Sequence, residues 1–216
     1  MTRWLWVAAL LGGLAAAPAS AATVEHLNLK RMVEMSELVV IGTVTAQGTR
    51  VEVSPRQVFT ETAFEIEEVV QGDKARPFMV LEQLGGTAYP GTPEEFTTVV
   101  PGYPQFRVGE RVLLFLERTP AGNLVITGLG QGKYTLFDDP KTGLTWAARD
   151  TTDLNIVRRQ RDPDLVFMGA PRSMDRMPLP QLLGLIQGRP VGPDVPVRIV
   201  GPKTRQLTLP APGEVR

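Results

Sequence analysis

The chain has 216 residues, of which 23 are basic and 23 are acidic, with one histidine and no cysteine. The lack of cysteine excludes disulfide bonds, a lipidated N-terminal cysteine and covalently attached c-type haem. Residues 23–148 carry 11 basic against 16 acidic side chains, whereas residues 188–216 carry 5 against 2. This weak basic excess in the tail does not indicate a nucleic-acid partner.

The first 21 residues have the pattern of an export signal. Arg3 provides a basic start, an apolar run follows from Trp4 to Ala17, and Ala19-Ser20-Ala21 has the small residues at which such signals are cleaved. The apolar run is shorter than the roughly 20 residues that a membrane-spanning helix needs. We therefore expect a signal peptide that is cleaved near Ala21, and an exported protein, periplasmic or extracellular, without a membrane span.

A short helix and a strand are expected next. Asn28 is a suitable N-cap for a helix that ends before Ser36. The segment Leu38–Thr45 is rich in β-branched residues and predicts a strand, in which Gly42 marks a bulge or a sharp bend. We expect residues 47–56 to form a loop or the tip of a hairpin.

Residues 60–67 alternate between a threonine or apolar side chain and, mostly, a glutamate. This period of two is typical of a strand in an antiparallel sheet with one buried face. The alternation breaks after Glu67-Glu68, which predicts a β-bulge. The apolar segment Phe78–Leu84 predicts the following strand.

The segment Val108–Glu117 predicts the central strand of the domain. After a Gly-Glu turn, five apolar residues follow in succession from Val112 to Leu116. Such a run is too short for a buried helix and is typical of a strand covered on both faces. Further hairpins are expected, with turns at residues 120–123 and 138–143.

The pattern changes after Arg149. Pro180 predicts the start of a short helix that ends at Gly188, and six prolines in residues 189–216 predict an extended or disordered tail. Short strands with glycine corners indicate a mainly β fold, a small antiparallel OB-like barrel with a short N-terminal helix and a C-terminal helix. The expected parts are a signal peptide (1–21), the OB-like β-barrel domain (22–148), a C-terminal extension with a short helix (149–188) and the proline-rich tail (189–216).

The order of the segments resembles a known family. The segments are Ser36–Val44, Phe64–Gly72, Val108–Leu116 and Gly122–Ile126. In this order they resemble the N-terminal domain of the tissue inhibitors of metalloproteinases and the related netrin-type modules, which are OB-fold barrels, and uncharacterised exported bacterial proteins of the same layout. The resemblance implies a barrel over about residues 35–129 and association with a metalloprotease. Those inhibitors chelate zinc through a disulfide-anchored N-terminal cysteine, which this chain lacks.

Few residues are suited to catalysis or to metal binding. His26 is the only histidine and lies close to the expected cleavage site, and no serine of the mature chain has the sequence setting of a nucleophile. The turn at residues 138–143 lacks the alternating oxygen ligands of a calcium loop. We expect no catalytic residue, no metal site and no cofactor.

Adjacent carboxylates are the remaining acid–base candidates. The pairs are Glu67-Glu68, Glu94-Glu95 and Asp138-Asp139. Solvated strand faces and turn chemistry account for them, although carboxylates distant in sequence can also form a glycosidase pair. Two alternative functions therefore stay open: a carboxylate-based hydrolase acting on envelope glycans, and a structural envelope protein.

The leading hypothesis is a non-enzymatic module that binds an unknown protein or envelope component. A long excursion between Gly85 and Arg107 carries four prolines interleaved with four aromatic residues, and long irregular loops in compact domains are usually functional or specially packed. The alternative is that these rings cap the open end of the barrel. The residues expected to contact a partner are Gly85, Gly86, Tyr89, Phe96, Tyr103 and Phe106.

Overall fold

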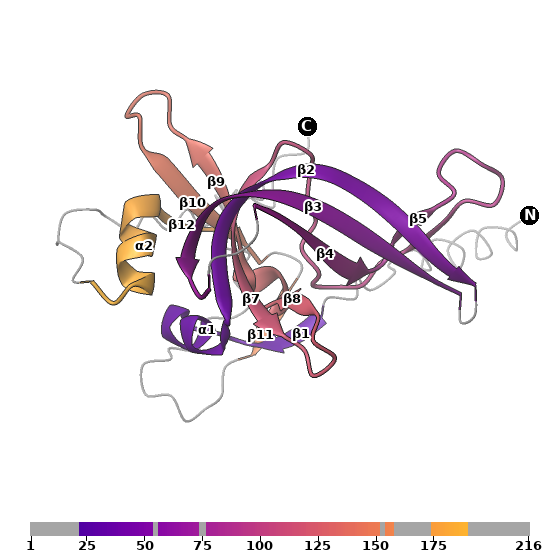
Figure 1. Cartoon of the computed structure of the whole chain (residues 1–216), viewed down its shortest axis with the longest axis horizontal. Coiled ribbons are helices and arrows are strands. Elements are labelled where there is room, and N and C mark those ends of the chain that lie inside the picture. The colour runs from indigo at the N-terminus through magenta and orange to yellow at the C-terminus, as the bar shows by residue number, and fades with distance from the viewer. Residues whose placement is uncertain (1–21, 54–55, 74–76, 152–153, 158–173, 190–216) are drawn as a thin grey trace, which may run out of the picture.

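The computed structural model describes residues 22–53, 56–73, 77–151, 154–157 and 174–189. The fold is mainly β, with an eight-stranded antiparallel sheet and two short α-helices (Figure 1). The elements are β1 (Ala22–Glu25), α1 (Leu29–Met35), β2 (Leu38–Val53), β3 (Arg56–Gln71), β4 (Phe78–Leu84), β5 (Gly86–Ala88), β6 (Phe96–Thr98), β7 (Arg111–Arg118), β8 (Leu124–Ile126), the 3-10 helix η1 (Leu129–Gly132), β9 (Lys133–Asp138), β10 (Thr145–Asp150), β11 (Leu154–Val157), β12 (Met174–Pro178) and α2 (Leu179–Ile186).

The main sheet is open. Its strands follow the order β12-β10-β9-β7-β2-β3-β4, and β8 pairs with β7 beside this path. Within the described chain, β12 and β4 form the two ends and do not pair with each other. The mainly β, antiparallel architecture with an N-terminal and a C-terminal helix is therefore confirmed, whereas closure into a barrel is not.

β7 is the central strand and is covered on both faces, as its apolar run predicts. Its residues Val112–Leu116 are each at most 1% exposed. Leu113 and Phe115 belong to a core that includes side chains of α1 and α2. The alternate residues of β7 belong to a second core, with Phe64 of β3 and Leu81 of β4. A strand buried on both faces needs this continuous apolar sequence.

The helix α2 belongs to the first of these cores. Leu182 of α2 is fully buried and packs in one cluster with Met32 of α1 and Val39 of β2. The boundary expected after Ala148 falls inside β10, whose partner β12 leads directly into α2. The segment expected to be a signal peptide (1–21) and nearly all of the proline-rich tail lie outside the described residues.

The strands β2 and β3 form one long curved ribbon (Figure 1). Of the loop or hairpin tip expected over residues 47–56, the hairpin is present, but its strands are longer than expected: β2 continues to Val53 and β3 begins at Arg56. The predicted bulge is confirmed: the register shifts between Ile41 and Gly42, and Glu67 has no partner on β2. A Cβ at Gly42 would lie 2.6 Å from the Glu65 carbonyl oxygen, so glycine is needed there.

The expected helix cap and hairpins are also present. The Oδ1 atom of Asn28 accepts a hydrogen bond of 2.8 Å from the Arg31 N–H, and β7–β8 and β9–β10 are antiparallel hairpins. None of the helices in the described part of the chain is long and apolar enough to cross a membrane.

We expect Leu182→Ala to lower the free energy of unfolding by about 2–5 kcal/mol, because it removes a fully buried side chain from a packed core. The matched control is Leu185→Ala on the exposed side of the same helix, which should change this free energy by at most about 0.5 kcal/mol. Urea unfolding of the mature protein measures both. Equal effects would show that α2 is not part of the domain core.

Candidate functional site

The residues expected to contact a partner separate into two groups. Gly85, Gly86, Tyr89 and Phe96 belong to the hairpin of β5 and β6 and its approach, which we call the β5–β6 hairpin (residues 85–98). The other two, Tyr103 and Phe106, lie in the return segment (residues 99–110) that leads to β7.

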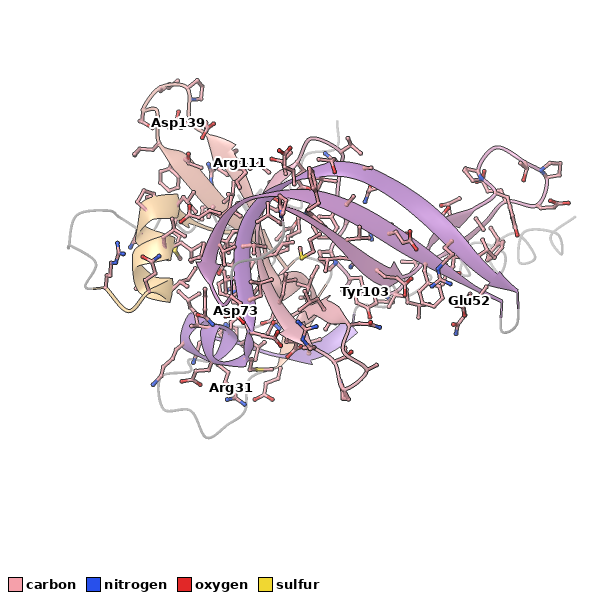
Figure 2. All side chains as sticks on the ribbon, viewed as in Figure 1. Arg31, Glu52, Asp73, Tyr103, Arg111 and Asp139 are labelled. Atoms are coloured by element: carbon pink, nitrogen blue, oxygen red, sulfur yellow. The ribbon has the colours of Figure 1, made fainter. Side chains whose placement is uncertain are left out.

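Phe106 is a core residue. It is 6% exposed, and its ring packs edge-on against Phe64 with the ring centroids 5.1 Å apart. This burial corrects its assignment as a contact residue. Tyr103 is half-buried in the same segment (Figure 2). The exposed part of the expected site is therefore the β5–β6 hairpin.

Two glycines turn the chain across one face of the ribbon. The Gly85 N–H donates to the Val58 carbonyl at 2.7 Å, which ends the pairing of β4 with β3. Gly85 and Gly86 then take φ values of 109° and 128°, which other residues rarely adopt. A Cβ at Gly86 would collide with Thr60 Oγ1 and lie 3.3 Å from Thr49 Cγ2, so the hairpin sits directly on β2 and β3. Its loop extends past the ribbon on the β2 side in the view of Figure 1.

The loop of the hairpin is held in shape by its own hydrogen bonds. The Tyr89 carbonyl accepts bonds from the Thr92 N–H at 3.1 Å and from the Thr92 hydroxyl at 2.8 Å. The Gly91 N–H donates to the Glu95 carboxylate at 2.6 Å. A loop that is ordered before binding loses little conformational entropy when a partner arrives.

Tyr89 combines exposure with an unusual backbone conformation. It is 44% exposed, its φ is 50°, and its ring centroid lies 6.4 Å from that of Phe96. A left-handed conformation at a residue other than glycine costs on the order of 1–3 kcal/mol and persists where the surroundings impose it, often at ligand-contacting sites. The ring of Phe96 is half-buried and lies beside the exposed ring of Tyr89.

The opposite face of the ribbon carries an acidic cluster, Glu52, Glu61 and Glu82. The Arg50 guanidinium lies 2.7 Å from Glu52, 3.5 Å from Glu61 and 2.6 Å from Glu82, and 4.7 Å from the centre of the Phe59 ring. The hydrogen bonds with Glu52 and Glu82 raise the pKa of Arg50 above its ordinary value. Three carboxylates around one guanidinium give this face a net negative charge.

A shielded ion pair fastens the return segment to β9. The Lys133 Nζ lies 2.7 Å from the Glu110 carboxylate, and the two side chains are 11% and 15% exposed. Lys133 also donates to the Gln105 carbonyl and lies 4.5 Å from the centre of the Phe106 ring. Burial lowers the pKa of Lys133, while the hydrogen bond to Glu110 opposes this shift. These contacts occupy the ammonium group, and we assign it a structural role.

At least one carboxylate of each adjacent pair has a structural partner. Glu67, re-aimed by the bulge, lies 2.7 Å from Arg111 Nε. Glu95 closes the hairpin loop, and Asp139 accepts a hydrogen bond of 2.9 Å from the Lys141 N–H, which lowers the pKa of Asp139. No group of three histidine or carboxylate side chains that could hold a metal ion occurs in the described residues. None of these contacts needs a catalytic role to explain it.

One part of the site was not expected from the sequence. The second half of β2, Thr45–Val53, projects with β3 beyond the end of β7 and carries the hairpin on one face and Arg50 on the other. The signal that could have revealed it is the valines on both sides of Ser54-Pro55, which are Val51 and Val53 before it and Val58 after it.

The comparisons add no relative. No family model matches the chain, and neither the curated proteins nor the solved structures contain a match. The resemblance to the tissue inhibitors of metalloproteinases thus depends on the order of the segments alone.

Glu110→Gln should lower the free energy of unfolding by about 2 kcal/mol at neutral pH, because it leaves the shielded Lys133 ammonium without its carboxylate. Burial lowers the pKa of Lys133, so the unfolded state binds this proton more tightly, and the folded state gains relative stability as the pH rises toward about 10.4. A neutral Lys133 is not attracted to the Glu110 carboxylate, so the loss of stability caused by Glu110→Gln should be smaller at alkaline pH.

Denaturant unfolding near pH 7 and near pH 10 measures this deficit. The matched control is Glu34→Gln, in an exposed pair with Arg31, which should change stability by less than about 1 kcal/mol at both pH values. A deficit for Glu110→Gln that grows with pH would contradict the assignment.

Proposed function

We propose that this chain is an exported, non-enzymatic module that binds a protein or another envelope component through the β5–β6 hairpin. The observation that carries the proposal is the exposed Tyr89 ring, held in a preformed turn beside Phe96. Tyrosine offers a large contact area at a low cost in conformational entropy and is enriched at protein interfaces. Val99, the first residue of the return segment, adds an exposed apolar side chain directly after the hairpin.

A relationship to OB domains is part of the proposal. The strands β4 and β8 lie side by side, with Cα atoms within 8 Å of each other, although no strand pairing joins them. With β2, β3 and β7 they would make a five-stranded, partly open barrel, and OB domains of this form bind through their loops. Association with an exported metalloprotease rests on the resemblance alone, and unimpaired protease activity at saturating protein would count against it.

Tyr89→Gly should reduce partner recovery about tenfold or more in a pull-down of the tagged mature protein from its own envelope fraction. The substitution removes the exposed ring at a φ that glycine adopts without strain, so the fold should be kept. Leu144→Ser is the matched control, since Leu144 is equally exposed but lies in the turn between β9 and β10. If Tyr89→Gly retained the same partners as Leu144→Ser, the hairpin would not be the binding element.

The full chain, expressed in a bacterial host, should be recovered outside the cytoplasm with Ala22 as its first residue, because Ala19-Ser20-Ala21 fits signal cleavage. N-terminal sequencing measures this. Ala21→Lys should block the cleavage, while Ala21→Gly should permit it. Recovery of an uncleaved chain from the cytoplasm would contradict export.

A further inference from the structure

The second half of β2 has a free edge. β7 pairs with Leu38–Thr43 of β2, and Val44 then exchanges backbone hydrogen bonds with Gly109 and Glu110. Over Thr45–Val53 the described chain places no strand on this side of β2, although β3 pairs with its other side. The free edge therefore continues the line that β7 occupies along the first half of β2.

The pairing of β3 with β4 determines which backbone groups reach this edge. The Gly85 N–H bonds to the Val58 carbonyl, so Val58 and every second residue from it direct their backbone groups toward β4. The backbone N–H and C=O groups of Phe59 therefore point toward β2, and those of its partner Arg50 point toward β3. The backbone groups that face the free edge are those of the alternate residues Gln47, Thr49 and Val51.

The charged side chains on this strand segment, Arg50 and Glu52, pair with each other at 2.7 Å and do not protect the edge. Exposed sheet edges are commonly protected by lysine, proline or inward-pointing charges. Arg50 instead extends over Phe59 and across β3 to Glu82 on β4, at 2.6 Å. Gly48 has open space around the position of a Cβ. An extended backbone can therefore approach Gln47, Thr49 and Val51 without displacing an ion pair.

The two faces beside the free edge differ in chemistry. On one face the β5–β6 hairpin, which carries Tyr89 and Phe96, packs on Thr49, and its loop extends past β2 in the view of Figure 1. On the other face lies the acidic cluster around Arg50. Side chains of an added strand alternate between faces, so apolar residues would meet the hairpin and basic residues the acidic cluster.

The outer edge of β4 is less accessible. The strand β8 lies beside it, and the Gln83 side-chain amide donates to the Pro104 carbonyl of the return segment at 3.4 Å. An added strand at that edge would meet these elements, whereas no strand of the described chain pairs with the edge of β2 beyond Val44.

We propose that an extended segment of the protein partner, with alternating apolar and basic side chains, adds to the sheet along Gln47–Val51 of β2. The inference rests on the proposed function and specifies how the partner binds: main-chain hydrogen bonds hold the segment, and the hairpin and the acidic cluster select its side chains.

The probe is an acetylated and amidated heptapeptide of alternating valine and lysine, added to the mature full-length protein and followed by amide hydrogen exchange. The amides of Gln47, Thr49 and Val51 should gain protection, while those of Gly48 and Arg50, already bonded to β3, should not change. A peptide of alternating valine and glutamate should bind at least about tenfold more weakly. No protection at millimolar peptide would overturn the proposal.

Thr49→Pro removes one N–H from the free edge without removing a bond to β3, and edge positions of this kind tolerate proline. It should weaken binding of the valine–lysine peptide about tenfold. The matched control is Val80→Pro, which removes an outward N–H from β4 and should stay within about twofold. Methylating the peptide nitrogens that face β2 should abolish binding without any change to the protein, which separates edge pairing from misfolding of Thr49→Pro.

Two other occupants of the free edge of β2 would give different experimental results. Self-association abolished by Thr49→Pro would assign the edge to a second copy of the chain, and peptide binding only after deletion of residues 190–216 would assign it to the tail; either result overturns the proposal. If Thr49→Pro kept the partner in the envelope pull-down and Tyr89→Gly lost it, the edge inference would be wrong and the proposed function would stand. Retention of the partner by both variants would contradict both proposals.

Discussion

The arrangement of the whole molecule depends on the limited pairing of β2 with β7. Along its first half β2 lies between β3 and β7, and Val39 and Val40 are buried in the cores on its two faces. Gly109, with a φ of 84°, turns the chain just before β7, and its N–H bonds to the Val44 carbonyl. Beyond that point β3 is the one strand that pairs with β2 in the described chain, and the two cores no longer cover its faces. The strand β2 thus belongs to the body of the sheet with its first half and to the projecting ribbon with its second half.

The two ion-pair arrangements have different consequences because their solvent exposure differs. Lys133 and Glu110 are shielded, so their contact fixes the return segment and holds Phe106 in the core. Arg50 and the acidic cluster are exposed, where ion pairs contribute little to stability. The exposed cluster instead determines the charge and the direction of side chains on one face of the ribbon. The shielded ion pair therefore orders the return segment, and the exposed cluster sets the surface charge of the ribbon.

The proposed binding surface joins two features that lie far apart in the sequence. Gly86 brings the β5–β6 hairpin onto Thr49, so a rigid aromatic loop lies beside an unpaired strand edge. A partner that used both would gain main-chain hydrogen bonds from β2 and side-chain contacts from Tyr89. Neither feature requires the loop to rearrange, because the hydrogen bonds of Thr92 and Glu95 hold it already.

The sequence by itself determined the elements whose burial or capping leaves a recognisable pattern of residues. The apolar run of β7, the cap at Asn28, the bulge at Glu67 and the strand β4 were all predicted, because burial on one or both faces leaves a periodic pattern. The distal part of β2 leaves no such pattern: residues 45–50 are exposed although the β5–β6 hairpin lies against Thr49, and hydrogen bonds with β3 make this part a strand. Tertiary structure alone decided that α2 joins the core, that the sheet stays open, and that Phe106 is buried while Tyr89 is displayed. Two aromatic residues in one proline-rich segment look alike in sequence, and what separates them is whether Phe64 or solvent lies opposite the ring.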